Sequence, residues 1–217
     1  MKLFARTDML DAFAQVCELA EGQRGQVALV QLRGQVPEQL LAQWQDAAII
    51  EPVADGVIRV RAGGNHPHPR LYAAWLASDV TPAWKRSPTA LAVSHQSAAQ
   101  LYGAGSVNPS GFEFTGRSRQ TPAAEVTVHP GSLQEDECGV VEGLPVTGPA
   151  RTLADLAAEG QGFDLSDLGR LARSFIAQGW TTADLLGTEL TAQFAGREPE
   201  HDGPSWLAAA LDAAAAG

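Results

Sequence analysis

The first third of the chain begins with helical patterns of apolar residues. Apolar side chains follow the 3.6-residue period of a helix over Leu10–Ala20, and a short second helix is predicted over Gln26–Leu32. A third helix is predicted to open at Val36 and Pro37, directly after a turn that contains Gly34. Three helices with a glycine-bearing turn before the last one are typical of a helix-turn-helix.

Two β-rich runs follow, over Ile49–Val53 and Val57–Arg61, and an Asp-Gly pair lies in the turn between them. Asp-Gly favours the positive φ angles of a tight hairpin, so these strands predict the wing of a winged helix. Because strand residues alternate between faces, Ile58 and Val60 are expected to face the core. The residues expected to face the opposite way, toward solvent or a phosphate backbone, are Val57, Arg59 and Arg61.

The predicted third helix separates an apolar stripe from a polar face. The residues of the stripe are Val36, Leu40, Leu41 and Trp44. Gln39, Ala42 and Gln43 fall on the other side, where glutamine can pair with adenine and a methyl group can contact the thymine methyl. The arginines expected to contact phosphates are Arg24, Arg33, Arg59 and Arg61. No lysine or arginine occurs between Arg33 and Arg59.

Beyond a linker at Gly63–Pro69 the pattern becomes mixed. Helices are expected over residues 70–78, 94–102, 149–158, 165–178, 182–194 and 204–216, and strands over 111–115, 125–129, 139–142 and 145–147. The sequence therefore predicts an α+β protein. The predicted protein has an N-terminal winged helix-turn-helix DNA-binding domain at residues 1–66. A mixed α+β domain with a helical C-terminal tail is predicted at residues 67–217.

Charge and cysteine content narrow the function classes. The chain has 217 residues with 15 basic and 25 acidic side chains, and its only lysines are Lys2 and Lys85, which excludes a polycationic nucleic-acid binder. Residues 67–217 carry nine basic and seventeen acidic side chains, so this part suits a protein partner better than DNA. The two cysteines match no metal spacing and no apolar run is long enough for a membrane span. We expect a cytoplasmic protein with no metal, cofactor or membrane partner.

Three groups of residues offer other chemistry, and each has a simpler explanation. Ser94 and His95 could form a hydrolase pair, but helix neighbours point about 100° apart, so Ser94 is interpreted as an N-cap and His95 as a packing or hydrogen-bonding residue. His66 and His68 lie between prolines without a nearby ligand partner, which argues against metal binding. The acidic run at residues 135–137 is typical of a solvated loop. The sequence has no Asp/Glu-x-Lys element of a nuclease, and we do not expect an enzyme.

Three stretches carry a family resemblance. They are ADGVIRV at Ala54–Val60, AVSHQSAAQLYG at Ala92–Gly103 and VVEGLPVTGPARTLADLA at Val140–Ala157. Taken in order they resemble the AbiEi family of antitoxins from type IV toxin-antitoxin systems, and the third stretch, in which Arg151 is interpreted as structural, is the most specific. The resemblance implies a winged-helix repressor that binds inverted repeats at its own promoter. It also implies a C-terminal domain able to neutralise a nucleotidyltransferase toxin.

Two main functional hypotheses follow. The first is a sequence-specific DNA-binding transcriptional autorepressor that resembles a type IV antitoxin and binds double-stranded promoter DNA. The alternative is an acidic protein-interaction module that neutralises a toxin or another partner without significant DNA binding. A third hypothesis, a hydrolase built on Ser94 and His95, ranks last.

Overall fold

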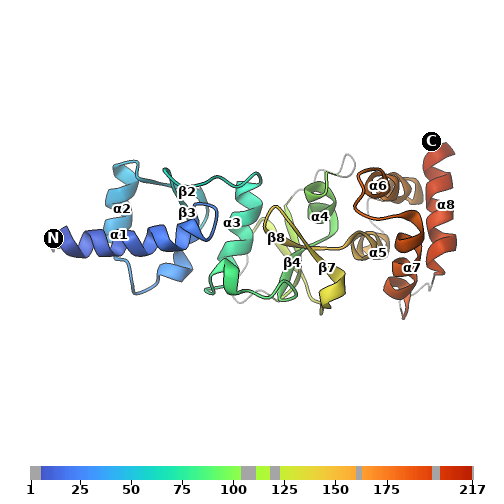
Figure 1. Cartoon of the computed structure of the whole chain (residues 1–217), viewed down its shortest axis with the longest axis horizontal. Coiled ribbons are helices and arrows are strands. Elements are labelled where there is room, and N and C mark those ends of the chain that lie inside the picture. The colour runs from blue at the N-terminus through green and yellow to red at the C-terminus, as the bar shows by residue number, and fades with distance from the viewer. Residues whose placement is uncertain (1–5, 104–110, 118–122, 160–162, 197–200, 217) are drawn as a thin grey trace. The chain divides into compact units, whose positions relative to one another are not determined.

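The computed structural model describes residues 6–103, 111–117, 123–159, 163–196 and 201–216. In these residues the protein is α+β with two sheets, as the sequence predicts (Figure 1). Its chain divides into two compact units. Unit 1 comprises Met1–Ser87 with Arg117–Val126, and unit 2 comprises Pro88–Gly116 with Thr127–Gly217. The domain border predicted between residues 66 and 67 falls inside unit 1.

Unit 1 begins with two helices and a three-stranded sheet. Its first elements are α1 (Arg6–Glu21), β1 (Gln26–Ala28), the 3-10 helix η1 (Leu29–Leu32), α2 (Glu38–Asp46), β2 (Ile50–Ala54) and β3 (Val57–Val60). The strands are antiparallel in the order β1-β3-β2. The helix predicted over Gln26–Leu32 is wrong, because its first three residues pair with β3. Pairing with a distant strand outweighs the local helical pattern there.

The apolar stripe predicted for the third helix packs into the core of unit 1. Val36, Leu40 and Trp44 are buried, and Leu41 is half-buried. Trp44 is only 5% exposed and meets the ring of Phe13 edge to face, with 5.2 Å between the ring centroids. This packing fixes which side of α2 faces solvent.

A further helix, α3 (Pro69–Ala77), packs against all three strands of this sheet. Nε2 of the buried Gln26 donates a hydrogen bond to the carbonyl of Pro69 at 3.1 Å. Alternation places Val57 on the same face as Gln26, and Val57 is 1% exposed. The prediction that Val57 points to solvent or DNA is therefore wrong, because α3 covers this face.

Buried amides and one arginine fasten the segment after α3 to unit 1. Gln23 and Gln31 exchange two side-chain hydrogen bonds of 2.9 Å, and Gln31 also donates to the carbonyl of Thr81 at 3.2 Å. Arg86 donates at 2.6–2.8 Å to the main-chain carbonyls of Trp75, Leu76, Asp79 and Thr81. This segment also holds the 3-10 helix η2 (Ala83–Lys85). These bonds explain why unit 1 extends beyond the predicted linker.

Unit 2 contains a five-stranded sheet in the order β6-β5-β4-β8-β7. The strands are β4 (Leu91–Val93), β5 (Phe112–Gly116), β6 (Val126–His129), β7 (Cys138–Val141) and β8 (Leu144–Thr147). β4 pairs antiparallel with β5 and parallel with β8, and β7 is antiparallel to β8. The sequence does not predict β4, because three fully buried residues show no alternation.

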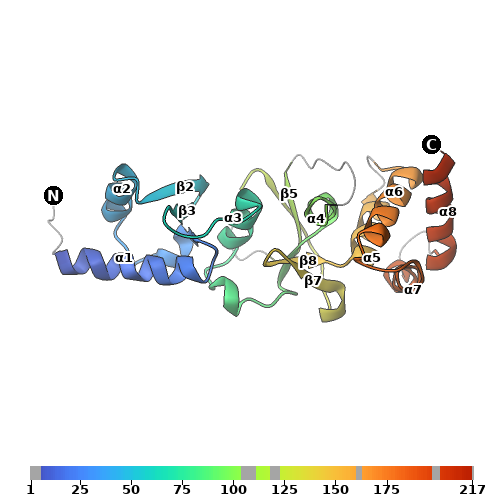
Figure 2. The same ribbon diagram turned by 45° about the horizontal axis from the view of Figure 1, so that its top comes forward.

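Helices flank this sheet and form the C-terminal part of unit 2. They are α4 (His95–Leu101), α5 (Pro149–Glu159), α6 (Leu165–Ala177), α7 (Ala183–Phe194) and α8 (Gly203–Ala216), and the 3-10 helix η3 (Glu135–Glu137) precedes β7. α6 and α8 lie side by side (Figure 2). Their backbones approach so closely that a Cβ at Gly169 would lie 1.9 Å from the carbonyl oxygen of Ala210. Only glycine fits at this crossing.

Among the described residues, none of the helices combines the length and the apolar character that a membrane span requires.

Replacing Trp44 with alanine should lower the free energy of unfolding of unit 1 by about 3–5 kcal/mol, because it removes a buried aromatic ring. Urea denaturation followed by circular dichroism measures the change. Trp84→Ala is the control, since Trp84 is 52% exposed and its removal should cost less. Equal losses in the two variants would show that Trp44 is not a core anchor.

Arg86→Lys should destabilise unit 1 by about 1–3 kcal/mol, because a single ammonium group cannot replace a guanidinium fork that bonds four carbonyls. The same denaturation experiment measures this loss. Lys85 is an exposed neighbour, and Lys85→Arg should change stability by less than about 0.5 kcal/mol. An Arg86→Lys protein as stable as wild type would show that the four carbonyl bonds of Arg86 do not stabilise unit 1.

Candidate functional site

The predicted base-reading residues lie together on the exposed side of α2. Gln39, Ala42 and Gln43 are all exposed, and their spacing places them on adjacent turns of one helix face. The same helix exposes Glu38 in its first turn and Asp46 at its end. The face therefore offers amide groups and a methyl group, flanked by negative charge.

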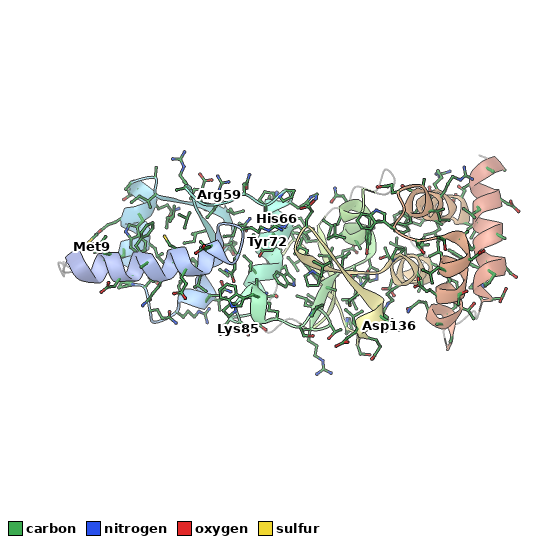
Figure 3. All side chains as sticks on the ribbon, viewed as in Figure 1. Met9, Arg59, His66, Tyr72, Lys85 and Asp136 are labelled. Atoms are coloured by element: carbon green, nitrogen blue, oxygen red, sulfur yellow. The ribbon has the colours of Figure 1, made fainter. Side chains whose placement is uncertain are left out.

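The four predicted phosphate contacts differ in how free they are. Arg24 and Arg33 are exposed. Arg59 and Arg61 both pair with Glu51: a terminal guanidinium nitrogen of Arg59 contacts Oε1, and Nε of Arg61 lies 3.4 Å from Oε2. The Arg59 side chain, labelled in Figure 3, is 23% exposed and that of Arg61 is 53% exposed. One carboxylate thus offsets part of the positive charge of the β2–β3 hairpin.

The role of Glu51 is not predicted from the sequence, although the sequence contains a signal for it. Glu51 lies directly opposite Arg59 in the register of β2 and β3. Opposite charges at directly facing positions of an antiparallel pair attract each other. The register of the predicted hairpin would have placed these two side chains together.

Ser94 and His95 lie at the junction of β4 and α4. Ser94 occupies the N-cap position, but its hydroxyl makes no capping bond, and Oγ instead lies 2.8 Å from Nδ1 of His95. The main-chain N–H of Gln96 donates to Oε2 of Glu113 at 3.0 Å. The predicted capping role of the Ser94 side chain is therefore wrong, and Glu113 on the neighbouring strand β5 takes that role.

The backbone and ring of His95 are tightly constrained. Its φ is 52°, and its ring stacks on that of His129 with 3.7 Å between the centroids. Nε2 of His129 lies 3.4 Å from Oε1 of Glu113. Ser94 is fully buried and His95 is 5% exposed. His95 is therefore both packed and hydrogen-bonded, which are the two roles inferred for it from the sequence.

His66 and His68, the two histidines between prolines, lie in the loop before α3. The ring of His66 stacks on Tyr72 with 4.4 Å between the centroids, and its Nδ1 accepts a hydrogen bond from the main-chain N–H of His68 at 2.9 Å. In the described part of the chain, no group of three or more metal-ligating side chains gathers. His66 packs this loop onto α3.

Arg151 links three parts of unit 2. Its Nε lies 2.9 and 2.8 Å from the two carboxylate oxygens of Asp155, and a terminal nitrogen donates to Oε1 of Glu137 at 3.0 Å. Glu137 also accepts bonds from Nε2 of Gln193 at 2.9 Å and from the main-chain N–H of Gln134 at 2.8 Å. Burial by itself raises the pKa of Glu137, but these hydrogen bonds and the charge of Arg151 lower it overall.

A cavity of about 360 Å³ lies beside this cluster, between β7, the start of α5 and α7. Its large exposed apolar lining residues are Val140, Trp180 and Leu185. Asp136 and Glu189 line it as well, and Figure 3 labels Asp136, which is exposed. Burial, followed by the charge of Asp136, raises the pKa of Glu189. The cavity therefore combines apolar walls with carboxylates.

Glu137→Gln should remove an acid-sensitive part of the stability of unit 2. A carboxylate whose pKa is lowered by folding stabilises the protein fully above its ordinary pKa of about 4.3, and this contribution is lost as the pH falls through the lower folded-state value. The urea midpoint of the wild type should therefore fall more steeply than that of the variant below about pH 4.3. Glu135→Gln in the same turn is the control, and a Glu137→Gln profile parallel to wild type would contradict the assignment.

No protein-family model and no curated protein matches the sequence. Among solved structures, the chain is similar to the crystal structure of the RV2827C protein from Mycobacterium tuberculosis, with a TM-score of 0.58 and 16% sequence identity. The likeness covers 96% of this chain and 79% of that chain. At this identity it shows a shared fold.

Proposed function

We propose that this protein is a sequence-specific DNA-binding repressor that binds inverted repeats in its own promoter. The observation that carries the proposal is the order of elements in unit 1: α1, β1, η1, α2 and then the β2–β3 hairpin, with the sheet order β1-β3-β2. This order is typical of a winged helix, with α2 as the recognition helix and the hairpin as the wing. Gly34, with a φ of 76°, provides the turn between η1 and α2.

The exposed face of α2 has the chemistry to read bases. Gln39 and Gln43 can each pair with the N6 and N7 edge of adenine, and Ala42 can contact a thymine methyl group. A recognition helix presents such side chains to the floor of the major groove. The exposed Arg24 and Arg33 supply phosphate contacts that hold the helix in register.

The charges of unit 1 favour a modest affinity for DNA. Glu51 holds Arg59 and Arg61 of the wing, and two further acids, Glu38 and Asp46, flank the reading face. Each phosphate that is neutralised releases counterions, so fewer free cations mean a shallower dependence of binding on salt.

The resemblance to AbiEi antitoxins extends the proposal to unit 2. In that role the protein acts in the cytoplasm, and its C-terminal domain neutralises a nucleotidyltransferase-type toxin. The third resembling stretch, Val140–Ala157, contributes the last two residues of β7, all of β8 and most of α5, including Arg151. The alternative function is an acidic protein-interaction module without significant DNA binding. One observation favours it: the carboxylate of Glu51 engages both wing arginines.

Binding to the DNA upstream of the protein's own gene, measured by fluorescence anisotropy over a range of salt, tests the proposal. The slope in question is that of the logarithm of the binding constant against the logarithm of the salt concentration. Phosphate contacts from Arg24 and Arg33 alone predict a slope of about −1.8, and contacts from all four arginines predict about −3.6. The wild type should lie between these values. Glu51→Gln should tighten binding and steepen the slope toward about −3.6, because it frees both wing arginines.

Two sets of variants distinguish contacts to bases from contacts to phosphates. Gln39→Ala and Gln43→Ala should reduce the discrimination between promoter and unrelated DNA. Arg33→Ala should weaken binding to all DNA sequences alike. Glu18→Gln on the exposed side of α1 is the matched control for Glu51→Gln and should change neither affinity nor slope. Absence of binding at low salt would overturn the repressor proposal in favour of the interaction module.

A further inference from the structure

The β7–β8 hairpin shows which main-chain groups of β7 face outward. Its turn residues, Glu142 and Gly143, have φ angles of 51° and 85°, as in a two-residue type I′ turn. Such a turn is closed by a hydrogen-bonded pair, here Val141 with Leu144. Hydrogen-bonded pairs recur at every second residue, so Cys138 and Val140 direct their main-chain N–H and C=O groups away from β8.

One printed bond beyond the hairpin supports this alternation. The N–H of Gly148 donates to the carbonyl of Glu137 at 2.8 Å, so Glu137, like Gly139 and Val141, belongs to the inward-facing set. β7 is the last strand of the described sheet, and no described strand pairs with its outer side. The outward N–H of Cys138 donates to the carbonyl of Glu135 in η3. The open part of the edge therefore comprises the carbonyl of Cys138 and the N–H and carbonyl of Val140.

The cavity described above lies along this open edge. All four residues of β7 line it, whereas Leu144–Thr147 of β8 do not, which places it beside the sheet rather than over a face. Its opposite wall is α7. Val140 is 64% exposed, Leu185 is 50% exposed and Trp180 is 44% exposed. We call this feature, an open strand edge with apolar walls, the β7 groove. An added strand would pair with β7 and bury these side chains.

The charge of the β7 groove selects the occupant. Arg151, the lining cation, is already bonded to Glu137 and Asp155. In the described part of the chain, no ion pair joins Asp136 or Glu189 to a basic side chain. Two carboxylates therefore stand beside the open edge without a described cation. Lysine or arginine side chains of a ligand would complement them, whereas nucleic acid would be repelled.

We propose that the β7 groove binds an extended, basic segment of a partner protein, which adds to β7 as a further strand. The carbonyl of Cys138 and the N–H and carbonyl of Val140 supply the main-chain hydrogen bonds. Val140, Trp180 and Leu185 receive apolar side chains of the segment. Asp136 and Glu189 receive its basic side chains. The proposal concerns unit 2 and does not depend on DNA binding by unit 1.

The test uses the full chain and a fluorescent peptide of alternating valine and lysine, about ten residues long, which matches a strand. Three peptides are compared in anisotropy titrations: this probe, the same peptide with glutamate for lysine, and the lysine peptide N-methylated on the backbone at alternate residues. The probe should bind. The glutamate peptide should not bind, and N-methylation should weaken binding by about tenfold or more, because it removes main-chain donors while keeping the charge.

Variants of the chain test whether the probe binds at the β7 groove. Val140→Pro removes an outward N–H that the β7–β8 ladder does not use, and Val140→Thr keeps it. Glu189→Lys reverses a charge of the groove, and Asp212→Lys makes the same change on the exposed side of α8. Val140→Pro and Glu189→Lys should each weaken probe binding by about fivefold or more. Val140→Thr should weaken it less than Val140→Pro because the N–H is kept, and Asp212→Lys should leave it unchanged. None of the four variants should alter DNA binding.

Specific outcomes would overturn the proposal. They are no binding of the lysine peptide, equal binding of the N-methylated or glutamate peptide, and wild-type affinity in Glu189→Lys. The N-methylated peptide keeps the test decisive even if Val140→Pro fails to fold. Dimerisation of the chain alone that Val140→Thr preserves and Val140→Pro abolishes would make a second copy the occupant, which would also refute a basic partner segment.

Discussion

The reciprocal amide pair of Gln23 and Gln31 is the interaction on which unit 1 depends. Both side chains are buried, and a buried amide is costly unless its donors and acceptors are bonded. Beyond their mutual bonds, Gln23 accepts the N–H of Ala83 at 3.0 Å, and Gln31 accepts the N–H of Ala28 at 3.1 Å. One pair of side chains thus joins the end of α1, the β1–η1 junction and the segment after α3. The position of η1, and with it the start of α2, follows from these bonds.

The longer elements were predictable because amphipathic helices repeat their pattern over several turns. α1, α2 and α5–α8 each overlap a helix expected from that period. The two strands that the sequence does not predict, β1 and β4, have three residues each and are buried throughout. Their partners include β3 and β8, which lie far away along the chain. A local sequence pattern does not show which distant segment will pair with a strand. For the same reason it does not show that α3 covers Val57.

The candidate sites were predictable only as far as each depends on one element. The exposure of Gln39 and Gln43 follows from the period of α2 alone. The pairing of charges on the β2–β3 hairpin depends on the register that brings Glu51 to Arg59, which requires the two strands to be aligned. The β7 groove depends on tertiary packing, because Val140 and Leu185 come from separate elements. The helical period predicts which residues share a face, whereas the partner of each residue is set by strand register and tertiary packing.

The location of Cys138 in the β7 groove determines how that surface responds to oxidants. Burial, with the charge of Glu137 adding to it, raises the pKa of its thiol to about 11. Peroxides, disulfides and alkylating reagents attack cysteine through the thiolate, of which roughly one part in ten thousand is present at neutral pH for such a pKa. Cys138 should therefore react with oxidants more slowly than an unperturbed cysteine, which slows chemical change of the groove surface.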